Sequence, residues 1–107
     1  MEYTVRVTAY VLRQMTEIYE YIRYTLQAPE NAARWLKRME SELASLSFMP
    51  ARIPLTEEEP WHSRGFHKML IGNYLVYFWI DGTRFHVWVT AVVYARRSQR
   101  EQLEQMR

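Results

Sequence analysis

The chain contains no cysteine among its 107 residues. This absence excludes disulfides, thiolate chemistry and cysteine-based zinc sites, and it is typical of a cytosolic protein. No apolar run reaches the roughly 18 residues that a membrane-spanning helix needs. The N-terminus has no basic region followed by an apolar stretch, so we expect no secretory signal. Hydrophobic residues still make up 49% of the sequence, which predicts one packed domain over residues 1–107.

Acidic residues are nearly missing between Pro60 and Arg100. Asp81 is the only acid of that stretch, against six basic residues, a balance of +5, whereas the whole chain carries +2. The six are Arg64, Lys68, Arg84, Arg96, Arg97 and Arg100. A cationic C-terminal half suits a polyanionic partner such as nucleic acid.

Three strand-like runs follow one another between Arg64 and Arg97, rich in the β-branched and aromatic residues that strands favour. Two short turns, Gly72-Asn73 and Asp81-Gly82, separate them, and their residues tolerate the positive φ of tight hairpins. The pattern predicts an antiparallel meander. Its middle run, Tyr74–Ile80, is apolar at both alternations, which predicts a central strand covered on both faces.

The N-terminal half predicts a strand and two helices. Residues 3–8 alternate apolar and polar, as a strand does, and Thr8 is placed to cap a following helix. Apolar residues at steps of three and four then predict one helix as far as Leu26 and a second from about Pro29 to Met49. The break between them is short, so the helices should form an antiparallel hairpin on one face of the meander.

The other segments complete the predicted fold. Prolines and Glu57–Glu59 indicate an irregular, solvated loop from Pro50 to Trp61, in which a general-base role for a carboxylate is the alternative interpretation. Capping-box spacing at Ser98 predicts a short C-terminal helix to Met106. A lone first strand would leave its backbone unpaired, so it should join the meander in one sheet. The expected fold class is α+β, with the helical hairpin on one face.

Several motifs, in this order along the chain, resemble those of a known family. They are Leu46-x-x-Met49-Pro50, Glu59-Pro60-Trp61-x-Ser63-x-Gly65-Phe66, Gly72-Asn73-Tyr74-Leu75-Val76-Tyr77 and Tyr94-Ala95-Arg96-Arg97. With the order of elements, they resemble the RelE/ParE superfamily of bacterial toxins over nearly the whole chain. The resemblance implies the toxin half of a type II toxin–antitoxin module, with no cofactor.

The resemblance leaves the target open. Some members cut messenger RNA on the ribosome and others poison DNA gyrase, so our first hypothesis is a ribosome-dependent mRNA endonuclease and the alternative is a gyrase inhibitor. A binding module without toxicity is the third. The resemblance also implies an antitoxin that wraps an extended, partly helical segment around the toxin. We expect its docking surface to be apolar, in a groove between the helical hairpin and the sheet.

Metal-free RNA cleavage needs a base for the 2′-hydroxyl, a cation for the pentavalent phosphate and an acid for the leaving oxygen. Where nuclease members carry a basic residue on the first meander strand, this chain has Lys68, and the family's basic pair is matched by Arg96 and Arg97. Additional candidates for RNA or phosphate contact are Arg64, Arg100 and Tyr94.

His67 departs from the family pattern, which has arginine at this position. The change either supplies a proton-transfer group or weakens phosphate binding. Strand alternation puts His67 and Lys68 on opposite faces, so both can face one site only if a bulge intervenes. Leu75, where some members are basic, and the absence of an aromatic residue in 98–101 favour the gyrase alternative. The three histidines lack metal-ligand spacing, so we expect no metal site.

Overall fold

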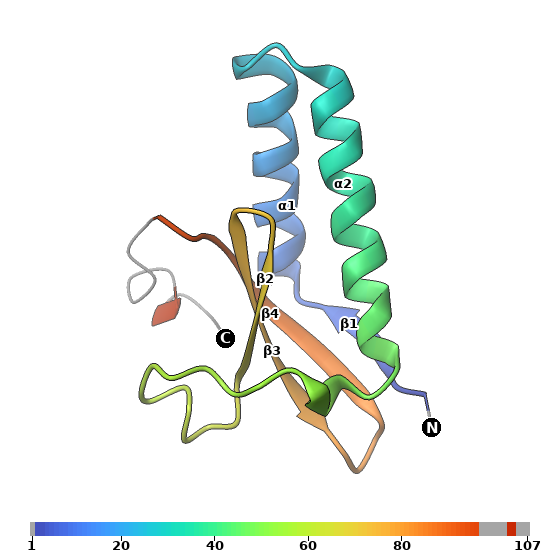
Figure 1. Cartoon of the computed structure of the whole chain (residues 1–107), viewed down its shortest axis with the longest axis vertical. Helices are drawn as coiled ribbons and strands as arrows, with labels where there is room; N and C mark the ends of the chain where they lie inside the picture. Colours follow the sequence, from blue (N-terminus) through green and yellow to red (C-terminus); the bar gives the residue numbers. More distant parts are fainter. Residues whose placement is uncertain (1, 97–102, 105–107) are drawn as a thin grey trace.

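The computed structural model describes residues 2–96 and 103–104. Its four strands form one sheet in the order β1-β4-β3-β2 (Figure 1). β4 (His86–Tyr94) pairs in parallel with β1 (Thr4–Val7) and antiparallel with β3 (Tyr74–Asp81), which pairs antiparallel with β2 (His67–Ile71). The α+β class, the meander and the attachment of the first strand to its sheet are confirmed.

Two helices form the predicted hairpin. α1 (Ala9–Glu20) begins at Thr8, whose Oγ1 accepts a hydrogen bond from the Val11 backbone at 3.2 Å. A π-helical turn, Tyr21–Thr25, extends α1 before the chain reverses into α2 (Pro29–Ala44), which has proline in its first turn. In Figure 1 the two helices stand side by side and their connection lies at the end remote from the N-terminus.

The second helix ends earlier than the sequence predicts. The α-helix stops at Ala44 and tightens into a 3₁₀ turn, Ser45–Ser47. Met49 then takes a left-handed φ of 46° directly before Pro50. Proline clashes with a preceding helical residue, so the helix cannot run to Met49.

The helical hairpin covers one face of the sheet. Buried side chains of both helices, including Val11, Met15, Met39 and Leu43, pack against strand residues such as Phe78. The spacing of three and four along each helix produces this arrangement, because it gathers the apolar residues on the side facing the sheet. None of the described helices is long and apolar enough to cross a membrane.

The opposite face of the sheet carries a second, smaller core. Trp61 from the loop and Leu103 from the C-terminal segment bury against strand residues on this face, which are Leu75, Tyr77, Ala91 and Val93. Both faces of β3 are therefore covered, as predicted. Of the predicted C-terminal helix, only Leu103 and Glu104 are described, and both are helical. The rest of that prediction lies outside the described residues.

Candidate functional site

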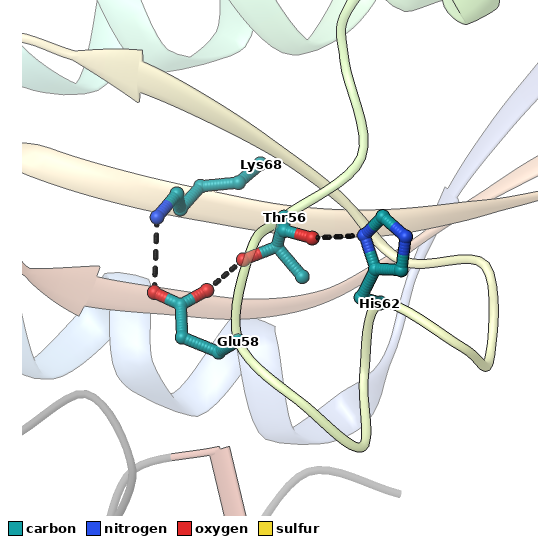
Figure 2. Close-up of polar contacts among 4 residues, drawn as sticks. All are labelled: Thr56, Glu58, His62 and Lys68. Atoms are coloured by element: carbon teal, nitrogen blue, oxygen red, sulfur yellow. Dashed lines mark hydrogen bonds and ion pairs between the residues drawn. The ribbon is translucent and has the colours of Figure 1, made fainter.

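A polar cluster lies where the loop between α2 and β2 crosses the second core (Figure 2). Lys68 Nζ donates to Glu58 Oε1 at 2.9 Å, and the two side chains are 28% and 30% exposed. The Thr56 hydroxyl donates to the other oxygen of the same carboxylate. Glu58 is thus held from two sides, and Lys68 faces a carboxylate and not open solvent.

Tyr77 supplies a third partner for Glu58. Its side chain is fully buried and its hydroxyl hydrogen-bonds the Glu58 carboxylate. Burial first, and then the negative charge of Glu58, raise the pKa of Tyr77 far above its usual value of 10.0. The phenol therefore stays neutral and serves as a hydrogen-bond donor. The sequence gave no signal for this contact, because Glu58 and Tyr77 are far apart in the chain and the loop has no period to follow.

Neighbouring contacts fix the loop that carries Glu58. His62 Nδ1 donates to the backbone oxygen of Thr56 at 2.8 Å (Figure 2). The Glu59 carboxylate accepts from the Ser63 hydroxyl at 2.7 Å and from the Ser63 backbone at 2.8 Å, and these bonds lower the pKa of Glu59. Glu57 and Glu59 are exposed, whereas Glu58 is half-buried. The loop is irregular, as predicted, but hydrogen bonds hold it in one conformation.

His67 lies on the other face of the sheet from Lys68. Its Nδ1 donates to the backbone oxygen of Ile53 at 2.7 Å, and its ring stacks on Phe78 with centroids 5.0 Å apart. The pairing of β2 with β3 is regular at both residues, so no bulge turns them to one side. The alternation predicted from the sequence is confirmed, and the structure does not bring His67 and Lys68 together.

The register of the sheet separates Lys68 from Arg96. Lys68 pairs with Tyr77, and Tyr77 with Ala91, so Lys68 lies level with Ala91 across two strand spacings. Arg96 follows after the end of β4 and is exposed. With strands ~4.8 Å apart and ~3.4 Å per residue, the two Cα atoms lie on the order of 20 Å apart. The two cations therefore do not converge on one phosphate.

The other predicted residues are spread out as well. Arg64 is exposed at the end of the loop, far from the end of β4 in sequence. Tyr94 packs edge-on against Tyr74, whose ring also contacts Trp35, with centroids 5.6 Å apart in each pair. Arg97 and Arg100 lie outside the described residues. Among the described residues, no group of three or more histidine, aspartate or glutamate side chains is placed to hold a metal ion.

A groove of about 1010 Å³ runs between α1 and the end of β4, and this is where Arg96 lies. Its walls are Tyr10, Arg13, Gln14, Glu17, Ile18, Tyr21, Ile22, Leu26, Tyr74, Val92, Val93, Tyr94 and Arg96. The groove lies between the helical hairpin and the sheet, as expected, but tyrosines and charged side chains line it together with apolar ones. The sequence reading placed Arg13, Gln14 and Glu17 on the outer side of α1. It missed the groove because the sheet does not extend beneath that side.

The fold resembles those of solved toxins. A ParDE toxin–antitoxin system of Pseudomonas aeruginosa superposes with a TM-score of 0.73 at 13% identity, covering 89% of this chain and 98% of that one. The RelBE2 complex of Mycobacterium tuberculosis gives 0.60 at 23% identity, covering 88% and 99%. A variant of the E. coli toxin RelE in the free state gives 0.63 at 15% identity, covering 98% of both chains. The class is therefore the RelE/ParE fold.

The sequence specifies the family more narrowly. The family described as the ParE toxin of the type II toxin–antitoxin system parDE matches residues 5–99. No curated protein matches the chain. The chain belongs to the ParE toxin family, and it is the toxin of a type II toxin–antitoxin system.

Proposed function

We propose that this toxin inhibits DNA gyrase by binding it, without catalysing a reaction of its own. The observation that carries this proposal is the dispersal of the candidate catalytic groups. Lys68 is paired with Glu58, His67 is hydrogen-bonded on the opposite face, and Arg96 lies on the order of 20 Å from Lys68 by strand spacing. RNA cleavage needs a base, an acid and a phosphate-binding cation at one point, whereas an inhibitor needs only a complementary surface.

The family match supports the same target. The chain matches the ParE family over most of its length, and gyrase poisoning is the activity that the resemblance offers besides RNA cleavage. The acid-poor C-terminal half would favour an encounter with a DNA-bound enzyme, because a positive surface speeds association with a polyanionic partner.

A supercoiling assay tests this proposal. Purified toxin in excess should block supercoiling of relaxed plasmid by gyrase and raise the amount of linear DNA trapped in cleavage complexes. Arg96→Glu should weaken inhibition by about tenfold or more, because it reverses a rim charge. Arg84→Glu is the matched control, since Arg84 is a 77% exposed cation at the β3–β4 turn. Normal supercoiling at excess toxin would rule the proposal out.

Ribosome-dependent mRNA cleavage is the second candidate, and one observation favours it. Glu58 and Lys68 place a carboxylate beside an ammonium group on one face of the sheet, and such a pair can exchange protons with a substrate. Incubation with ribosomes programmed with mRNA decides between the two activities. Cuts that vanish in Lys68→Ala and in Glu58→Gln, but persist in Arg84→Ala, would establish the nuclease and remove the gyrase proposal.

The proposal includes toxicity and an antitoxin partner. Expression of the toxin alone in a bacterial host should arrest growth, and continued growth would instead indicate a binding module without toxicity. Co-expression with the neighbouring open reading frame should restore growth and yield a complex that purifies as one species. We place the antitoxin in the groove between α1 and β4, where tyrosine and arginine side chains offer the anchors typical of protein interfaces.

A further inference from the structure

β4 is longer than the strand beside it. The register of β1 on β4 ends at Val7 and Val89, and the last bond of this ladder runs from the Thr8 backbone to Val89 oxygen at 3.1 Å. β4 then continues to Tyr94, while the chain turns from β1 into α1 (Figure 1). Residues 90–94 therefore have β3 on one side and, within the described part of the chain, no strand on the other.

The backbone of this half-strand directs its hydrogen-bonding groups towards α1. The Ala95 N–H donates to Asn73 oxygen at 2.9 Å, on the β3 side. Successive residues of a strand alternate the side to which their N–H points, so Val92 and Tyr94 point the other way. The Val92 N–H confirms this direction, because it donates to Gln14 Oε1 at 2.9 Å.

Gln14 thus occupies the place of a missing strand. A buried backbone N–H needs an acceptor, and in a complete sheet the carbonyl of the next strand provides it. Here a side-chain amide from α1 performs that role at Val92 alone. Tyr94 lies two residues further along the same edge, where no described residue lies opposite it as a strand.

The groove along this edge has the chemistry of an interface for an acidic segment. Arg13 and Arg96 line it against a single acid, Glu17. Tyr10, Tyr21 and Tyr94 line it as well, and tyrosine and arginine are the residues that most often anchor protein interfaces. A negatively charged partner is complementary to this lining.

We propose that an extended, acidic segment of the antitoxin adds to the sheet here as a β-strand, pairing with Val92 and Tyr94 and displacing the Gln14 side chain. This inference rests on the antitoxin partner of the proposed function and specifies how that partner binds. A strand fits the edge because it offers free backbone carbonyls. A helix does not fit, because its carbonyls are bonded within the helix.

Amide hydrogen exchange, measured by NMR on the isotope-labelled toxin, tests the inference. The probe is the product of the neighbouring open reading frame, co-purified with the toxin. Exchange at the Tyr94 N–H should slow by about 100-fold in the complex, as for a newly paired strand residue. In free Gln14→Ala the Val92 N–H should exchange faster than in the wild type, and complex formation should restore its protection. Thr16→Ala is the control on α1, since Thr16 is exposed and bonds only to Leu12 within the helix.

The outcomes separate this inference from the proposed function. A complex in which Tyr94 exchange is unchanged overturns the strand site but keeps the antitoxin. A loss of affinity above about tenfold in Gln14→Ala, with Thr16→Ala unaffected, also overturns it, because Gln14 would then contact the partner directly. Failure to form any complex overturns the antitoxin together with the strand site. Protection at Tyr94 in a toxin that leaves gyrase untouched supports the strand site and removes the target.

Discussion

Replacing Tyr77 by phenylalanine removes one hydroxyl from the contact that holds Glu58. The change leaves the buried ring in place, so it isolates the hydrogen bond to the carboxylate. A hydrogen bond to a charged group contributes about 1.5–3 kcal/mol, and the lower end applies here because Glu58 is half-exposed. Urea unfolding at pH 7 should therefore show a loss of about 1–2 kcal/mol in the free energy of unfolding.

The same variant should reverse its disadvantage in alkali. The folded pKa of Tyr77 is raised above the unfolded value of 10.0, so the neutral phenol stabilises the fold fully below pH 10. Above that pH the unfolded chain releases the proton and the folded chain keeps it. The wild type should then lose about 1.4 kcal/mol per pH unit relative to Tyr77→Phe, which has no such proton.

Unfolding curves of both proteins from pH 7 to pH 11 test this reasoning. The gap between them should stay constant to about pH 9 and close by pH 11. Other tyrosines and the lysines titrate in both proteins and cancel in the difference. A gap that stays constant over the whole range would refute the buried, neutral phenol at Tyr77. No gap at pH 7 would refute the hydrogen bond to Glu58.

Three other substitutions have defined outcomes. Gly72→Ala should lower stability by about 1 kcal/mol or more, because Gly72 has a φ of 60°, whereas Gly82→Ala, at an open site without that φ, should be near neutral in thermal unfolding. Lys68→Ala should cost less than about 1 kcal/mol, and the loss should shrink in high salt, since the pair is partly exposed. His67→Ala should destabilise by about 1–3 kcal/mol, because it leaves Ile53 oxygen without its partner, yet gyrase inhibition per folded molecule should stay unchanged.

The fold follows from short-range patterns. Turn residues such as Gly72-Asn73 and the double-sided apolar run Tyr74–Ile80 predicted the meander and its covered central strand, because these patterns are local. The parallel pairing of β1 with β4 was outside their reach. The sequence required only that the first strand join the sheet, and it did not specify at which edge or in which direction.

The candidate site was predictable only in part. Alternation correctly separated His67 from Lys68, since side-chain direction along a strand has a fixed period. The contact of Lys68 with Glu58 comes from an irregular loop, in which no period relates sequence to position. The separation of Lys68 from Arg96 depends on strand register, which the bulge between Tyr77 and Phe78 also affects, and a sequence pattern does not specify that register.

Gyrase and programmed ribosomes, assayed side by side with one preparation of the toxin, test the central claim most directly. The dispersed cations and the paired Lys68 predict blocked supercoiling with trapped cleavage complexes, together with intact mRNA. Messenger RNA cut in a manner that depends on Lys68, with supercoiling unaffected, would contradict the claim.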